Sequence, residues 1–254
     1  MEKEVLIKEY EIHYYEVDFR KQMKITSLID FFGDLATCQS ENLGVGMDYL
    51  FSNNLGWVLY KWDIDIHSYP KYGDKIKIKT MPYGFRRFYA YRIFEVFNEE
   101  GELIAEAKSI WFLLNIERKR PVRIESQFYK AYGIDETCKD MFEIEDISKV
   151  EDVQEEKIFN VRYDDIDTNK HVNNSKYASW AIEALPLDIL LNYKLNKIKI
   201  TYQKETKYGE TISSKVQVRK KENTALCNHS IQDREGNILA LIETSWEEEG
   251  TENR

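Results

Sequence analysis

The sequence is short of cysteine, and the cysteines it has are poorly placed for cross-linking. Its three cysteines, Cys38, Cys138 and Cys227, are odd in number and lie far apart. This spacing excludes a disulfide framework and matches no zinc motif. We therefore expect a protein of the reducing cytoplasm.

Long apolar runs and an excess of positive charge are also lacking. No run approaches the ~18 apolar residues of a membrane-spanning helix. The first residues, MEKEVLIKEYEI, carry acids from the second position on, which is typical of neither a secretory signal nor a transit peptide. The formal net charge is -9 and the pI is near 5.2, which argues against nucleic acid as the main partner.

Glycine (11) and proline (4) are scarce, whereas the chain holds 17 Tyr, 12 Phe and 5 Trp. Aromatic side chains suit the pleated, half-buried surface of a β-sheet. Hydrophobic residues make up 43% of the chain, which is enough for a full core. The 254 residues suffice for one large domain or for two of ordinary size.

The chain repeats itself. GELIAEAKSIW (101–111) matches GNILALIETSW (236–246) at a spacing of 135, with Gly, Ala and Trp at equal places. Tyr72-Gly73-Asp74 matches Tyr208-Gly209-Glu210 at a spacing of 136, and Asp18 lies 149 residues before Asp167. Three matches in the same order indicate two copies of one unit.

Each copy has the same expected order of elements. In the first, hydrophobic periodicity predicts a strand, then a helix, then four strands, at 8–17, about 24–43, 57–69, 74–81, 86–97 and 103–115. In the second, the same order falls at 157–163, about 174–185, 197–203, 212–220, 225–232 and 238–246.

This order predicts an α+β fold of two domains, each an antiparallel β-sheet wrapped around a central α-helix. We expect an N-terminal domain over residues 1–125 and a C-terminal domain over 155–254. The acidic segment between them, 126–154, shows no clear period and is expected to be a linker on the surface.

The segment DIDTNKHVNNSKYASW (165–180) carries the most specific motif, D-x-N-x-H-V-N-N-x-x-Y-x-x-W. It resembles the active-site segment of acyl-acyl carrier protein thioesterases, of the bacterial kind. YPKYGD and KSIWFLLN resemble the N-terminal repeat of the same family. The likeness runs from about residue 5 to about residue 248 and implies a tandem hotdog fold.

The resemblance also implies an activity in fatty acid biosynthesis. Members hydrolyse the thioester that joins a fatty acyl chain to acyl carrier protein, which ends chain elongation, and they use no metal and no organic cofactor. The expected partner is therefore an acyl carrier protein bearing a fatty acyl chain, and the N-terminal domain is expected to house that chain. A homodimer is compatible with the sequence, which leaves acyl chain length and oligomeric state open.

The motif has a chemical logic of its own. Asp167, Asn169 and His171 alternate, so in an extended segment their three side chains point to the same side. Asn173 or Asn174 is suited to cap the helix that follows. The triplet would then stand at a helix N-terminus, where free N–H groups and the dipole favour the oxyanion of thioester hydrolysis.

A second acid comes only from the resemblance. TYQKETKYGE looks like the family segment with a catalytic carboxylate, which falls on Glu205. Some members carry a cysteine next to it, but this chain has Thr206, so a Cys-His mechanism is discarded. Glu205 is expected to act as base on water or as nucleophile, with His171 and Asn169 holding water and thioester. Asp167 is expected to orient its neighbours.

Other interpretations stay open. Asp167 and His171 could ligate a metal, Asn173 and Asn174 could be structural caps only, and Glu205 could be an ordinary solvated acid. At the level of function, the alternatives are an acyl-coenzyme A thioesterase with the same site and a non-catalytic acyl-binding module.

The first copy gives an internal control. The positions that match Asp167, Asn169 and His171 hold Asp18, Arg20 and Gln22. Neither Arg nor Gln can act as a base near neutral pH, so this copy should be catalytically silent.

An acidic carrier protein needs a local basic patch on this acidic chain. Two basic runs are candidates, YGFRRFYAYR with Arg86, Arg87 and Arg92, and NIERKRPVR with Arg118, Lys119, Arg120 and Arg123.

Overall fold

A computed structural model describes residues 2–249. The chain divides into two compact units, one of residues up to 61 with 67–144, the other of residues 62–66 with those from 145 on. We call them the first and the second unit. Within the described residues, no helix is long and apolar enough to cross a membrane.

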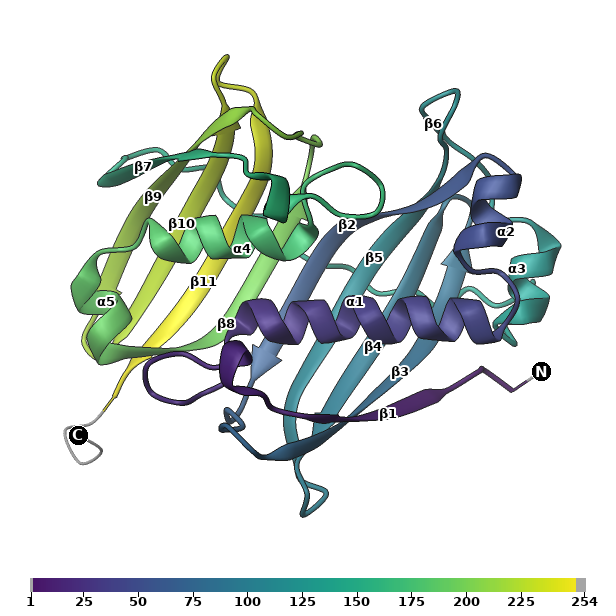
Figure 1. Cartoon of the computed structure of the whole chain (residues 1–254), viewed down its shortest axis with the longest axis horizontal. Helices are drawn as coiled ribbons and strands as arrows, with labels where there is room; N and C mark the ends of the chain where they lie inside the picture. Colours follow the sequence, from purple (N-terminus) through teal and green to yellow (C-terminus); the bar gives the residue numbers. More distant parts are fainter. Residues whose placement is uncertain (1, 250–254) are drawn as a thin grey trace. The chain divides into compact units, whose positions relative to one another are not determined.

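The first unit is built on a sheet of antiparallel strand pairs, with α1 (Ile25–Asn42) lying across its face (Figure 1). Its strand order is β1 (Leu6–Glu11), β3 (Lys75–Arg86), β4 (Tyr89–Phe97), β5 (Leu103–Asn115) and β2 (Leu55–Ile66), and β6 (Arg120–Pro121) pairs with the end of β5. Short helices complete the unit: η1 (Tyr14–Glu16), α2 (Met47–Ser52) and α3 (Ser126–Ala131).

The helix α1 forms where the apolar period predicted it. Its sheet-facing residues are at most 5% exposed: Ile25, Leu28, Ile29, Phe32 and Leu35. The ring of Phe32 lies 4.6 Å from that of Phe94 on β4, measured between centroids. Helix and sheet therefore bury one continuous apolar layer, which is the main favourable contribution to folding this unit.

The second unit repeats this plan with a shorter helix, α4 (Asn174–Glu183), over its sheet (Figure 1). Its strand order is β8 (Tyr193–Tyr202), β11 (Ile238–Glu248), β10 (Thr224–Asp233), β9 (Thr211–Lys221) and β7 (Glu155–Asn160). The helix α4 ends before Pro186, which caps α5 (Leu187–Asn192), and η2 (Tyr163–Asp165) precedes α4. Proline cannot continue a helix, which explains the break.

Local hydrogen bonds repeat along with the plan. The indole of Trp111 donates to Ser109 Oγ at 2.8 Å, and the indole of Trp246 donates to Thr244 Oγ1 at 2.8 Å. The hairpin glycines of the two copies, Gly101 and Gly236, have φ of 83° and 81°. The residue matches found in the sequence thus occupy the same local structure.

Two expectations need correction. Residues 8–17 do not form one strand, because β1 ends at Glu11 and the chain then turns through η1. The segment between the copies is not only a surface connection either. Phe128, Tyr132 and Ile134 are at most 2% exposed and pack in the core of the first unit, which a search for periodicity could not detect in so short and acidic a stretch.

Candidate active site

Residues 167–171 form a tight turn, not the extended segment that we expected. The amide of Asp167 donates to the carbonyl of His171 at 2.8 Å, and the Asp167 carboxylate accepts the amides of Asn169 at 2.8 Å and His171 at 3.2 Å. Lys170 has a φ of 65°, in the left-handed region. The three alternating motif residues therefore belong to an Asp-closed turn, in which the aspartate side chain accepts hydrogen bonds from the backbone amides that follow it.

Asn173 caps the helix that follows the turn, as predicted. Its side-chain oxygen accepts the amide of Ser175 at 3.1 Å, and α4 begins at Asn174. The amide of Asn173 in turn donates to the carbonyl of Asp165 at 2.8 Å. The turn is thereby fixed directly before the N-terminus of α4, where backbone N–H groups favour negative charge.

Asp165 anchors the entry to this turn from inside the unit. Only 2% of it is exposed, and it accepts hydrogen bonds from the Arg162 amide at 2.9 Å and from the Arg162 guanidinium at 2.9 Å. Burial acts to raise the pKa of this carboxyl, but the bonds from Arg162 and the charge of Lys176 hold it below its ordinary value. The carboxylate form therefore stabilises the folded segment.

The turn brings His171 to Glu205. The imidazole Nε2 lies 3.0 Å from Glu205 Oε2, and the two side chains are 32% and 51% exposed, so both can reach solvent or a ligand. Glu205 stands in the loop that follows β8. The amides of Gln203 and Lys204 both donate to the carbonyl of Leu239, and the amide of Val172 donates to the carbonyl of Thr206 at 3.1 Å. The loop is held on both sides of Glu205.

The contacts of Asp167 differ from those of an acid in a catalytic triad. Its carboxylate bonds backbone amides and the side chain of Asn169, whose Nδ2 lies 3.4 Å from Asp167 Oδ2. The acid in contact with the imidazole is Glu205. Asp167 thus shapes the turn, while Asn169 lies exposed beside it.

Sequence reasoning missed one residue next to this pair. Tyr177 lies in α4 and is only 3% exposed. Burial raises the pKa of its phenol, and the charges of Glu205 and Asp167 add to the shift. A signal was available, since the first copy has Leu28 at the matching position.

The first unit contains the same turn without the same chemistry. The amide of Asp18 donates to the carbonyl of Gln22 at 2.9 Å, and the Asp18 carboxylate accepts the amides of Arg20 at 2.8 Å and Gln22 at 3.1 Å. Lys21 has a φ of 62°. At a spacing of 136, the place of Glu205 is taken by Tyr69. The frame is repeated, but acid and imidazole are not.

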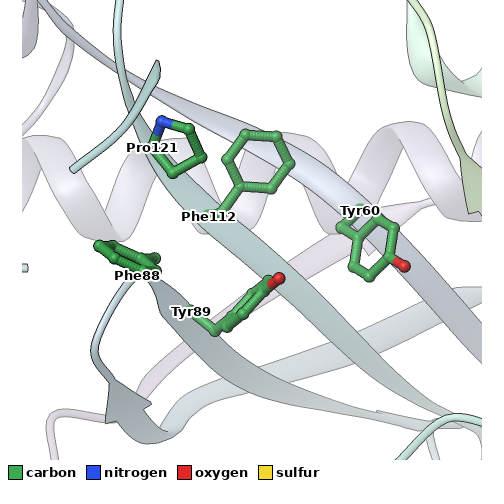
Figure 2. Close-up of a pocket in the computed structure, with 5 residues that line it drawn as sticks. All are labelled: Tyr60, Phe88, Tyr89, Phe112 and Pro121. Atoms are coloured by element: carbon green, nitrogen blue, oxygen red, sulfur yellow. The ribbon is translucent and has the colours of Figure 1, made fainter. Parts of the chain in front are cut away.

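The first unit also holds a cavity of about 240 Å³ (Figure 2). Aromatic rings and one proline line it: Tyr60, Phe88, Tyr89, Phe112 and Pro121. The hairpins β3–β4 and β5–β6 contribute to it, and each carries one of the two basic runs. Ile124 donates its amide to the carbonyl of Arg87 at 2.8 Å, so the two runs come together beside the cavity.

One residue of the expected docking runs does not belong there. Arg92 is 8% exposed, and its guanidinium donates to the side chains of Gln39 and Thr80 between α1 and the sheet. Burial lowers its pKa. It cannot meet a partner on the surface, unlike the exposed Arg86 and Arg87.

Chemically, the site offers a carboxylate held by an imidazole next to a helix N-terminus. Such a pair can take a proton from water, and the N–H groups near it can stabilise an oxyanion. In residues 2–249, no group of three or more His, Cys, Asp or Glu side chains is placed to hold a metal ion.

Two family models match this chain. Residues 3–132 match the acyl-ACP (acyl carrier protein) thioesterase N-terminal domain, and residues 148–248 match the acyl-ACP thioesterase C-terminal domain. Among curated proteins, an acyl-[acyl-carrier-protein] hydrolase from Cuphea viscosissima is 23% identical over 93% of this chain and 61% of its own length. This chain spans about three fifths of the length of the curated relatives that it matches.

Solved structures agree on the fold. A crystal structure from Lactobacillus plantarum, named an oleoyl thioesterase, superposes with a TM-score of 0.93 at 26% identity and covers 98% of both chains. The 12:0-ACP thioesterase from Umbellularia californica gives a TM-score of 0.86 at 22% identity, covering 96% of this chain and 94% of the other. The fold is that of two tandem hotdog units, as expected.

Proposed function

The chain belongs to the acyl-ACP thioesterase family, and from this premise we propose that it hydrolyses the thioester of fatty acyl-acyl carrier protein. The products are a free fatty acid and the thiol of the carrier's prosthetic arm. The observation that carries the proposal is the 3.0 Å contact between His171 and Glu205 beside the start of α4. The three cysteines are free, which fits a cytoplasmic enzyme.

The proposed reaction uses this chain's own side chains for proton transfer. Glu205 accepts a proton from water while the water oxygen bonds to the thioester carbonyl carbon. The resulting oxyanion lies by the N–H groups at the start of α4, which stabilise it. The C–S bond then breaks, and the sulfur leaves with a proton returned from Glu205.

Positions of the other residues follow from the turn. His171 holds the carboxylate of Glu205 through Nε2, and the exposed side-chain amide of Asn169 orients the thioester or the water. Asp167 keeps both of them in place through the backbone amides that it accepts. Direct attack of Glu205 on the carbonyl carbon, giving an anhydride, is the competing route with the same residues.

We propose different tasks for the two units. The second, with a domain over residues 155–254, is catalytic, and the first, with a domain over 1–125, accommodates the acyl chain; residues 126–154 connect them. The silent turn of the first unit supports this division, because Arg20, Gln22 and Tyr69 stand where Asn169, His171 and Glu205 stand in the second.

A gain-of-function attempt tests this division. Gln22→His should create no second site, because Tyr69 supplies no carboxylate there. In a His171→Ala background, fatty acid release should therefore remain at the level of His171→Ala alone. Restored activity would show that the first unit can catalyse and would overturn the assignment.

We propose the two basic hairpins of the first unit as the place where the carrier protein docks. Exposed arginines and a lysine lie on the two hairpins that line the aromatic cavity, and the guanidinium of Arg87 lies over the ring of Phe88, 5.2 Å from its centroid. A net charge of -9 makes such a local positive surface unusual on this chain. An acidic carrier is attracted there, and the aromatic rings offer it apolar contacts (Figure 2).

One assay decides between the candidate functions. Fatty acid release is measured on matched acyl-carrier and acyl-coenzyme A substrates over a ladder of chain lengths. Faster turnover of the carrier substrates supports the proposal, and a preference for coenzyme A would assign a different substrate to the same site. Tight acyl binding without any turnover would make the chain a binding module.

A further inference from the structure

Four aromatic side chains stand on the surface around the silent turn of the first unit. Tyr14 and Tyr15 belong to η1, Phe19 lies in the turn itself, and Tyr72 lies in the segment beside the turn. Each of the four residues is at least 59% exposed. Large apolar groups that gather on a surface mark contact sites. We call these four residues the aromatic patch.

Local contacts hold the patch together. The rings of Tyr14 and Tyr72 meet edge to face, with their centroids 6.5 Å apart. The amide of Tyr72 donates to the carbonyl of Lys21 at 3.1 Å, which fixes the Tyr72 segment beside the turn. The guanidinium of Arg20 lies over the ring of Phe19, 5.1 Å from its centroid. Aromatic rings and cations therefore share one surface.

The second unit forms the same turn without half of this patch. It keeps the tyrosine pair as Tyr163 and Tyr208, whose rings also meet edge to face at 6.5 Å. The other two aromatic positions hold Asp164 and Thr168 instead. The turn thus folds with polar side chains at both positions, so the two additional exposed rings of the first unit are not required for its shape.

The charge around the turn is inverted as well. In the first unit, residues 13–24 and 69–75 carry five Lys or Arg and three acidic side chains. The matching residues 162–173 and 205–211 of the second unit carry three Lys or Arg and five acidic side chains. On a chain of net charge -9, the silent turn is therefore a locally positive surface, which attracts an anionic partner.

The charged side chains point to the same partner chemistry. Of the three acids of the first unit's turn, Glu16 is buried and Asp18 accepts amides within the turn. The cations that remain outside include Lys21, Lys24 and Lys71, which are all exposed. The aromatic patch is thus bordered by lysines that can reach phosphate groups.

This combination suits the surface of an anionic lipid membrane. Phenol rings have an apolar body and a polar end, and they gather where lipid tails meet headgroups. Lysines beside such rings are attracted to anionic headgroups. A turn and a three-residue helix present their side chains singly, which suits entry between headgroups better than the closely packed centre of a protein interface.

We propose that the silent turn of the first unit is a membrane-docking surface. The four rings of the aromatic patch enter the headgroup layer of an anionic bilayer, and Lys21 and Lys71 bind its phosphates. The inference goes beyond the proposed hydrolysis and does not depend on it. Together with that function, docking would bring the release of an apolar product to the lipid that can absorb it.

Vesicle flotation of the full chain tests the inference. The parent protein should float with mixed phosphatidylglycerol–phosphatidylcholine vesicles and should stay behind with pure phosphatidylcholine. Tyr15→Asp combined with Phe19→Thr should lower the partition coefficient about 10-fold or more, because two rings no longer enter the bilayer. The new residues are those of the second unit at the matching positions, so the turn should keep its fold and Tm should hardly change.

Two matched pairs of lysine variants test the charges. Lys21→Gln with Lys71→Gln should weaken binding to the anionic vesicles about 30-fold at low salt, and less at high salt, because each lysine near the surface adds to the attraction. Lys170→Gln with Lys207→Gln makes the same change at the matching positions of the second unit and should leave binding nearly unchanged.

Several outcomes would overturn the inference. They are a parent protein that does not float with anionic vesicles, binding that survives Tyr15→Asp with Phe19→Thr, and equal losses for both lysine pairs, which would assign binding to overall charge. If the aromatic variant lost affinity for an acyl carrier protein and kept its vesicle binding, the patch would dock a protein and the membrane assignment would be wrong.

Fatty acid release, measured without vesicles, reports on the proposed function separately. Its absence in the parent protein would overturn that function, whereas the membrane inference would still be decided by the vesicle data.

Discussion

At the scale of single residues, the function proposed here depends on one carboxylate. Glu205 is the acid that touches the imidazole of His171, and the backbone carbonyl of its neighbour Thr206 accepts the amide of Val172. The two adjacent residues can therefore be separated by experiment, since Glu205 carries a carboxyl group and Thr206 carries only a hydroxyl.

Glu205→Gln should lower kcat by about 10² to 10⁴, the usual cost of losing a general base, because the amide keeps the size but cannot take a proton. Thr206→Ala should cost little, because the contact that Thr206 makes with the motif turn uses its backbone carbonyl. Both are measured as fatty acid release in steady state. If Thr206→Ala abolished turnover while Glu205→Gln kept most of it, the hydroxyl would be the nucleophile and Glu205 would not be the base.

The sequence identified these side chains but not their contacts. Asp167, Asn169 and His171 were found from one motif, and Glu205 only from resemblance, because nothing local distinguishes it from a solvated acid. The pairing of Glu205 with His171 joins two loops, and single-sequence patterns carry no information about such contacts.

At the scale of elements, the turn before α4 depends on Asp165. Its side-chain carboxylate is buried and accepts hydrogen bonds from Arg162. Its backbone carbonyl accepts the amide of the cap residue Asn173. The pKa of the Asp165 carboxyl is lowered in the folded protein. Its stabilising effect is therefore complete above the ordinary aspartate value of about 3.9 and is lost as pH falls through the lower folded value.

Asp165→Asn should lower the free energy of unfolding by about 1 to 3 kcal/mol at pH 7, because a charge-assisted bond is replaced by a neutral one. The difference between the two proteins should stay constant from pH 7 to about 4, the ordinary aspartate pKa, and should shrink below it as the pH falls toward the lower folded pKa of the Asp165 carboxyl. Urea unfolding at several pH values measures it. A difference that stays constant below about pH 4 as well would assign the loss to altered packing instead of charge.

Helices and strands were largely predictable, and the exceptions have physical reasons. The helices at 24–43 and 174–185 and the strand at 103–115 were set by apolar periods that packing later satisfied. The prediction of one strand over 8–17 was wrong because η1 is too short to show a period. The prediction of an extended segment over 167–171 was wrong because an aspartate can close a turn in a sequence whose polar residues alternate as in a strand.

At the scale of the whole molecule, one frame occurs twice and carries different side chains. Each unit places a helix over an antiparallel sheet and precedes that helix with an Asp-closed turn. The sequence revealed the duplication through its spacings of 135, 136 and 149. The meeting of the two basic runs at one cavity was not foreseen, because it depends on how two hairpins of the first unit pack together.

Carrier docking should respond to charge on these hairpins. Replacing Arg118, Lys119 and Arg120 by Glu should raise KM for an acyl-carrier substrate and leave kcat nearly unchanged, because these exposed side chains lie at the turn of the β5–β6 hairpin and at the start of β6. The effect should weaken as salt rises, since exposed charges are screened beyond about 8 to 10 Å.

Turnover of a short synthetic thioester is the control for this triple variant, since that substrate has no carrier to dock. It should be hydrolysed at the parent rate. Equal losses on both substrates would point to damaged folding, and an unchanged KM for the carrier substrate would place docking elsewhere.

The silent turn at Asp18 has a consequence for enzyme engineering. It keeps its shape with Arg20 and Gln22 where the second unit has Asn169 and His171. The aspartate and the left-handed lysine therefore define the loop, and the two positions between and after them tolerate a long cation or a neutral amide. Libraries randomised at Asn169 and His171 should therefore consist mainly of folded proteins. Such libraries could be screened for new chemistry, because the first unit already forms this turn with other residues at the two positions.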